Sequence, residues 1–158
     1  DNAFAIIQGL ETVALRMKQH CGNAEKVVNF LKKHKEVTKV IYSTEHEKKI
    51  ADRAKKYLKG GNGPMVGIEL KGGIEAGKKF IESLKMFYHV ANIGDARSLA
   101  IHPASTTHSQ LNEKELAASG VTQSYVRLCI GIEHIDDIID DLDQALNKSS
   151  KGSLKAVS

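Results

Sequence analysis

One arginine stands out in the sequence because its neighbours could hold it ready for a ligand. In the stretch SYVRLCIGI the apolar residues alternate, so Val126, Leu128 and Ile130 are predicted to form the buried face of a strand. Arg127 then falls on the opposite face. Its guanidinium offers a planar fork of donors, which matches a carboxylate with two parallel hydrogen bonds. Arg127 is therefore a candidate for carboxylate binding, and the alternative is a structural ion pair to Glu69 on a neighbouring strand.

A second candidate region is segment 92–111, NIGDARSLAIHPASTTHSQL, which concentrates polar side chains and shows little helical or strand periodicity. It is either a surface loop or a fixed wall around a ligand. Its two histidines, His102 and His108, have no cysteine or acidic pair nearby at ligand spacing, so we expect no metal site.

Other motifs that carry chemistry are missing from the sequence. The glycines at 60–63 and 71–74 lack the spacing of a phosphate-binding loop, and there is no Gly-x-Ser-x-Gly elbow. Cys129 lies within a predicted strand and is interpreted as a buried thiol. The aspartates at 136–143 avoid the apolar stripe of a helix and are predicted to be solvated. The residues alone therefore indicate an anion-binding arginine without a complete catalytic set.

Size and composition fit one globular domain. The chain has 158 residues, of which 41% are hydrophobic, and its net charge is +4. The basic residues are not interleaved with aromatic ones, which argues against nucleic-acid binding. No apolar run approaches the roughly 18 residues that a membrane span needs. Cys21 and Cys129 lie far apart, which favours a reducing compartment such as the cytoplasm.

Periodicity predicts an α+β fold in which one mainly antiparallel sheet of about four strands is covered by helices. A long N-terminal helix is expected from about residue 3 to His34, with a possible bend at Gly22. Asn112 is expected to cap a short helix, with Glu115 three residues further on. The remaining predicted elements are strands at 37–43, 65–71, 87–93 and 124–132, helices at 46–58, 74–84 and 134–146, and a flexible tail at 148–158.

Three segments, 9–31, 92–111 and 127–146, together resemble the pyridoxal-phosphate-dependent enzymes of cysteine and methionine metabolism. The features shared with the O-acetylhomoserine sulfhydrylase branch are the Asn-x-Gly-Asp sequence at 92–95, Ser98-Leu99, the His-Pro-Ala-Ser sequence at 102–105, and Gly131-x-Glu133. The resemblance implies that residues 1–147 form the C-terminal substrate-binding domain, the small domain of the aspartate-aminotransferase-like fold. It covers about the last third of such an enzyme. The large domain, which carries the Schiff-base lysine and the cofactor-binding residues, is not matched.

The resemblance also implies roles for two residues. Arg127 falls on the family's arginine that binds the substrate α-carboxylate, and Asn92 falls on a position that faces the same carboxylate. No catalytic, cofactor-binding or metal-binding residue is expected in this chain, and contacts of Thr107 or His108 with a ligand are left open. The implied parent enzyme is a homotetramer that makes homocysteine from O-acetylhomoserine and sulfide by γ-replacement. The alternatives are a cystathionine γ-synthase, a methionine γ-lyase, or a free-standing carboxylate-binding or interaction domain.

Overall fold

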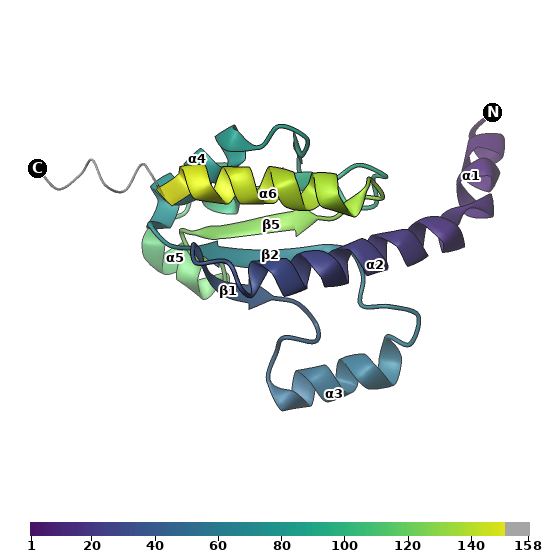
Figure 1. Ribbon diagram of the computed structural model, residues 1–158, viewed down its shortest axis with the longest axis horizontal. Coiled ribbons are helices and arrows are strands. Elements are labelled where there is room, and N and C mark those ends of the chain that lie inside the picture. The colour runs from purple at the N-terminus through teal and green to yellow at the C-terminus, as the bar shows by residue number, and fades with distance from the viewer. Residues whose placement is uncertain (151–158) are drawn as a thin grey trace, which may run out of the picture.

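The computed structural model describes residues 1–150 and shows one sheet with helices packed on it (Figure 1). The helices and strands, in chain order, are α1 (Asn2–Glu11), α2 (Val13–Leu31), β1 (Val37–Ile41), α3 (Lys48–Tyr57), β2 (Met65–Leu70), α4 (Gly73–Ser83), β3 (Tyr88–His89), β4 (Leu99–Ile101), the 3-10 turn η1 (Pro103–Ser105), α5 (Glu113–Ala118), β5 (Tyr125–Cys129) and α6 (Ile135–Ser149).

The sheet has five strands in the order β1-β2-β5-β4-β3. Pairing is antiparallel between β1 and β2, between β2 and β5 and between β4 and β5, whereas the short β3 runs parallel to β4. The expected α+β class and the mainly antiparallel sheet are therefore confirmed, with five strands in place of about four. The additional strand is β4, which lies inside the segment for which the sequence predicts no regular structure.

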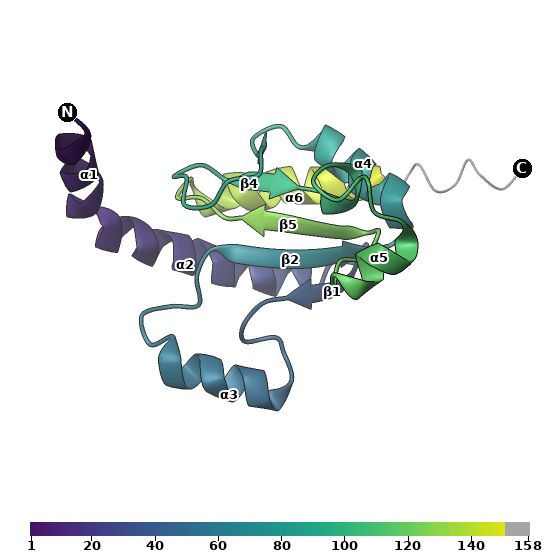
Figure 2. The ribbon, with the colours of Figure 1, turned by 180° about the vertical axis from the view of Figure 1, so that it is seen from behind.

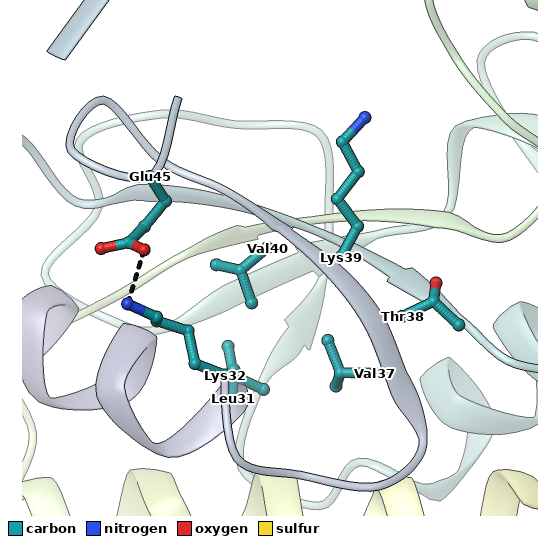
Figure 3. A pocket seen from close by; sticks show the side chains of 7 residues that line it. All are labelled: Leu31, Lys32, Val37, Thr38, Lys39, Val40 and Glu45. Carbon is teal, nitrogen blue, oxygen red and sulfur yellow. Dashed lines mark ion pairs between the residues drawn. The ribbon is translucent and has the colours of Figure 1, made fainter. Parts of the chain in front are cut away.

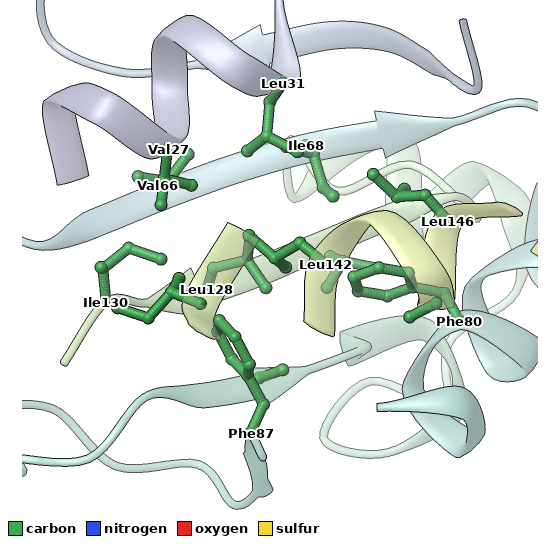
Figure 4. Packing of buried hydrophobic residues seen from close by; sticks show 14 of the residues in the cluster. Val27, Leu31, Val66, Ile68, Phe80, Phe87, Leu128, Ile130, Leu142 and Leu146 are labelled. Atoms are coloured by element: carbon green, nitrogen blue, oxygen red, sulfur yellow. The ribbon is translucent and has the colours of Figure 1, made fainter. Parts of the chain in front are cut away.

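The core fills the space between one face of the sheet and the helices α2, α4 and α6 (Figures 1 and 4). Because side chains alternate along a strand, β5 sends Val126 and Leu128 into this layer. Figure 4 shows Leu128 and Ile130 next to Leu142 of α6, with Phe80 of α4 beyond them. Arg127 consequently lies on the other face of the sheet, which these three helices leave uncovered.

The long N-terminal helix is broken, but at Thr12 and not at the predicted bend at Gly22. Thr12 has φ −110° and ψ 4°, and it separates α1 from α2, whereas Gly22 lies inside α2. The guanidinium of Arg16 stabilises the break, because it donates to the hydroxyl of Thr12 and, at 2.9 Å, to the carbonyl of Gly9. The break turns α1 away from the direction of α2 at the far end of the molecule (Figure 2).

Helix α3 lies outside the main layers, on an excursion between β1 and β2 (Figures 1 and 2). The two ends of this excursion are tied together. The hydroxyl of Tyr42 donates to the carbonyl of Gly63 at 2.9 Å, and the hydroxyl of Ser43 donates to the side-chain oxygen of Asn62 at 3.1 Å. We call these two hydrogen bonds the α3 clasp.

The C-terminal boundary differs slightly from the expectation. Helix α6 continues to Ser149, two residues beyond Asn147, after which the tail is predicted to begin. The side chain of Ser149 is buried and donates to the carbonyl of Leu146 at 2.7 Å. The rest of the predicted tail, residues 151–158, lies outside the described residues. Within residues 1–150, no helix is both long and apolar enough to cross a membrane.

Candidate functional site

Arg127 lines a hollow on the open face of the sheet. The cavity has a volume of about 390 Å³. Its walls come from β5, from the adjoining ends of β1 and β2, and from the excursion that carries α3. Its lining residues are Ile41, Tyr42, Ser43, His46, Ile50, Asn62, Met65, Val66, Gly67, Tyr125 and Arg127. The lining is mostly apolar, and Arg127 is its one permanently charged side chain. A low-dielectric wall around one guanidinium strengthens its attraction to an anion.

The ion pair between Arg127 and Glu69, considered as the structural alternative, does not form among the described residues. Glu69 lies opposite Tyr125 in the strand register, and its carboxylate is 3.6 Å from the ammonium of Lys39. Within residues 1–150 no carboxylate forms an ion pair with Arg127. Its guanidinium contacts the protein through Nη2, which donates to the backbone carbonyl of Asn92 at 3.5 Å. Most of the donors on the guanidinium thus remain available to a ligand.

Gly67 and Tyr125 shape the surface beside Arg127. Gly67 faces Arg127 across the β2–β5 pair, and a Cβ atom at Gly67 would lie 2.6 Å from the ring of Tyr125. The absence of a side chain on Gly67 therefore lets the Tyr125 ring lie across β2. Burial raises the pKa of the Tyr125 phenol, while the charge of Arg127 opposes this shift. The phenol is accordingly a neutral neighbour of the arginine.

Asn92 lies beside Arg127, but through its backbone and not through its amide. The side chain is exposed, and its oxygen accepts a hydrogen bond from the N–H of Ile93 at 2.9 Å. The predicted donation from the Asn92 amide to a substrate carboxylate remains a prediction. Thr107 and His108 hydrogen-bond to each other at 2.8 Å, and neither lines the cavity of Arg127.

His102 is a structural residue of segment 92–111. Its ring is fully buried, with Nε2 donating to the carbonyl of Gln123 and Nδ1 accepting from the hydroxyl of Ser105, both at 2.8 Å. The ring packs on α4 at Gly77, where a Cβ atom would approach Nε2 to 2.3 Å. Within the described part of the chain, no three His, Cys, Asp or Glu side chains are grouped so that they could hold a metal ion.

Burial of His102 makes stability depend on pH. Burial is the main cause that lowers the pKa of His102 below its ordinary value of 6.5, although the hydrogen bond to Gln123 opposes the shift. The unfolded chain therefore takes up a proton at a higher pH than the folded chain does, so acid favours unfolding. We expect the free energy of unfolding, measured by urea titration, to fall as the pH drops below about 6.5.

His102→Gln should flatten this pH dependence while lowering stability at neutral pH. The matched control is His108→Gln, because His108 is partly exposed and lies outside the core. In the control, the free energy of unfolding should fall with decreasing pH as steeply as it does in the natural chain. Equal slopes for the two variants would contradict the assignment to His102.

A polar cluster that the sequence did not predict joins segment 92–111 to the end of β5. The carboxylate of Glu133 accepts hydrogen bonds from Ser98, from the backbone N–H at 2.6 Å and from the hydroxyl at 2.9 Å. Asn23 on α2 donates from its amide to the carbonyls of Gly131 at 3.0 Å and of Glu133 at 2.9 Å. His20 lies one turn earlier on α2, with its ring 2.7 Å from the carbonyl of Ile130.

The sequence carried one signal for this cluster. A polar His20 and a polar Asn23 lie beside the apolar stripe of α2, where both are buried. Buried polar groups require partners, so the two residues mark the helix face that meets another polar segment. Their partners lie more than 100 residues away in the sequence, which is why spacing could not identify them.

One aspartate of α6 is also buried, contrary to the expectation of a solvated acidic run. The carboxylate of Asp141 accepts from the backbone N–H groups of Lys85, Met86 and Phe87, at 2.8 to 3.3 Å. It therefore fixes the turn between α4 and β3. The acidic residue satisfies three amides that would otherwise be unpaired.

A second hollow, of about 210 Å³, lies between the end of α2 and β1 (Figure 3). Lys32 and Glu45 meet across it in an ion pair of 2.6 Å. The third charged residue of its lining, Lys39, pairs with Glu69 at 3.6 Å, so each charged side chain of this hollow already has a partner of opposite charge. The cavity of Arg127 is the better candidate site.

The sequence matches known enzymes along almost its whole length. The model of the Cys/Met metabolism PLP-dependent enzyme family matches residues 1–147. An O-acetyl-L-homoserine sulfhydrylase from Leptospira meyeri is 53% identical over 146 residues, which are 92% of this chain and 33% of that protein. An L-methionine gamma-lyase from Fusobacterium nucleatum subsp. polymorphum is 44% identical over 93% of this chain and 37% of that protein.

The fold also matches a solved structure. An O-acetylhomoserine (thiol)-lyase from Campylobacter jejuni, which carries a pyridoxyl-lysine monophosphate, superposes with a TM-score of 0.84 at 44% identity. The match covers 92% of this chain and 35% of that structure. The chain thus spans about a third of the length of the relatives that it matches.

Proposed function

Because this chain belongs to the Cys/Met metabolism PLP-dependent enzymes, we propose that it is the C-terminal substrate-binding domain of an O-acetylhomoserine sulfhydrylase. The observation that carries the proposal is Arg127, which lines a mostly apolar cavity and forms no ion pair within the described residues. The parent enzyme proposed here is a cytoplasmic homotetramer that acts in methionine biosynthesis.

Arg127 holds the substrate by its α-carboxylate. Two N–H groups on one edge of the guanidinium bind the two carboxylate oxygens. This pair of bonds fixes the direction of the amino acid as well as its position. The sheet holds the arginine rigidly, because β5 is paired on both sides, with Gly67 and Ile101 opposite Arg127. A substrate that is already oriented on a rigid strand loses less entropy when it reaches the transition state, which lowers the barrier of the chemical step.

The described residues do not by themselves form a site for pyridoxal phosphate, the cofactor of the family. No lysine lines the cavity of Arg127, so the cavity has no amine for attachment of the cofactor aldehyde. We therefore assign cofactor binding to the large domain of the parent enzyme. When bound there, the cofactor supplies the electron sink for bond cleavage next to the amino group, and this chain supplies the orientation of the substrate.

The exposed apolar surface of helix α1 supports the proposal that a large domain packs against this chain. Its apolar residues Phe4, Ile6, Ile7 and Leu10 are each more than half exposed, and no residue of α1 is buried. A helix that is apolar around its circumference is typical of a buried position. In Figure 1, α1 lies at the end of the molecule, away from the sheet, where another domain has room to surround it.

The overall reaction proposed for the parent enzyme is γ-replacement. Acetate leaves the γ-carbon of O-acetylhomoserine, and sulfide adds at the same carbon to give homocysteine. In this reaction Arg127 contacts the carboxylate and takes no part in proton transfer. The walls of its cavity exclude water from one side of the substrate.

A γ-lyase is the second candidate, because the relatives include methionine γ-lyases of similar identity. An assay of the full-length enzyme with O-acetylhomoserine and sulfide distinguishes the two. We expect homocysteine as the main product and slow release of thiol from methionine. Faster turnover of methionine than of O-acetylhomoserine would favour the lyase. The 158-residue chain with added pyridoxal phosphate is the control, and it should turn over neither substrate.

A further inference from the structure

The orientation of Arg127 depends on a loop that has little structure of its own. The carbonyl of Asn92 is the acceptor that the guanidinium contacts, at 3.5 Å. Residues 89–97 around it are mostly exposed and contain no helix, and β3 ends at His89. A carbonyl in such a loop can orient an arginine only if the loop is held in place elsewhere.

Ser98 closes the base of this loop. Its carbonyl accepts from the N–H of Tyr88 at 3.0 Å, so the residues on either side of the loop are tied together. The guanidinium of Arg97 stacks over the ring of Tyr88, 4.7 Å from its centre. Ser98 is completely buried, so its position is set by the groups around it.

Glu133 fixes Ser98 relative to the strand that carries Arg127. The Ser98 hydroxyl donates to the Glu133 carboxylate and accepts from the N–H of Gly131, in each case at 2.9 Å. The N–H of Ile132 donates to the carbonyl of Ala96, also at 2.9 Å. These bonds form a continuous path from the end of β5 to the loop, and hydrogen bonds in such a network reinforce one another.

Resting on the proposed function, we infer that Glu133 is a positioning residue for substrate binding. Through Ser98 it places the loop so that the carbonyl of Asn92 holds one Nη group of Arg127. The other donors of the guanidinium are then directed to the substrate carboxylate. Glu133 itself does not line the cavity and does not touch the substrate.

The variant Glu133→Gln tests this inference in the full-length enzyme, because it keeps the size of the side chain but replaces one acceptor with a donor. We expect KM for O-acetylhomoserine to rise about tenfold and kcat to stay within about twofold, since a loosened arginine weakens binding of substrate and transition state alike. In an Arg127→Ala background the same change should alter KM less than about twofold, because Glu133 acts through Arg127.

Asn112→Ala is the matched control for a loss of stability alone. Asn112 caps α5 with a capping box, so its loss lowers stability, and Asn112 does not line the cavity of Arg127. KM should be unchanged in this variant. In the 158-residue chain, the NMR resonance of the Arg127 Nε–H group should shift in Glu133→Gln and not in Asn112→Ala.

The outcomes separate the inference from the function on which it rests. An unchanged KM in Glu133→Gln, or an equal rise of KM with and without Arg127, overturns the positioning role while leaving the proposed function intact. An unchanged KM in Arg127→Ala overturns the proposed function, and the inference falls with it.

Discussion

Arg127→Ala is expected to raise KM for O-acetylhomoserine about 100-fold in the full-length enzyme. Two charge-assisted hydrogen bonds at about 1.5 kcal/mol each amount to about 3 kcal/mol, and each 1.4 kcal/mol changes an equilibrium constant tenfold. The bonds to the carboxylate are the same in the bound substrate and in the transition state, so kcat should change only a few-fold. Steady-state kinetics with varied O-acetylhomoserine measures both constants.

Two further variants make this test specific. Arg127→Lys keeps the charge but loses the planar fork, so KM should rise by an intermediate factor of about tenfold. Lys39→Ala removes an exposed cation from the edge strand β1, where it pairs with Glu69 outside the cavity, and KM should stay as it is. Equal kinetics for Arg127→Ala and Lys39→Ala would remove Arg127 from the site.

Gly131→Ala is expected to lower the free energy of unfolding by about 3 kcal/mol or to prevent folding. A Cβ atom there would lie 2.1 Å from the Glu133 carboxylate, 2.5 Å from the nitrogen of Ser98 and 2.6 Å from the carbonyl oxygen of Ala96. Two of these three atoms belong to the backbone and cannot turn away. The strain therefore falls on the junction between β5 and the loop of Asn92.

Gly22→Ala is the control that makes the same chemical change without the clash. Gly22 lies inside α2, and apart from its chain neighbours and the backbone of its own helix nothing lies within 4 Å of the position of its Cβ. Alanine should stabilise the helix there by about 0.5–1 kcal/mol. Urea unfolding of the two variants and of the natural chain measures the change in the free energy of unfolding that each substitution causes. A Gly131→Ala chain as stable as the natural one would show that the junction can relax.

The sequence predicted those elements whose side chains alternate or recur with a helical period. The capping box at Asn112 was predicted from residue types alone and is present, because a cap depends on local contacts. Strand β4 was missed, since Leu99, Ala100 and Ile101 are all buried and so do not alternate. The break at Thr12 was missed because it depends on Arg16, whose side chain reaches back along the helix.

In the candidate site, too, the sequence predicted the features that depend on local periodicity and missed those that depend on contacts between distant residues. Strand alternation placed Arg127 on the face opposite the core, and the structure agrees. Helical periodicity placed Asp141 off the apolar stripe, but it could not show that the turn at 85–87 brings three amides to it. The contact between Ser98 and Glu133 joins residues 35 positions apart and follows from packing of the whole sheet. Local patterns do not contain that information.

The α3 clasp has a consequence for how such a domain can evolve. Because Tyr42 and Gly63, together with Ser43 and Asn62, join the two ends of the excursion, the chain between them is topologically a side loop of the β1–β2 hairpin. Insertions and deletions there leave the register of the hairpin unchanged. One wall of the Arg127 cavity can thus change in length and sequence without displacing the strand that carries the arginine.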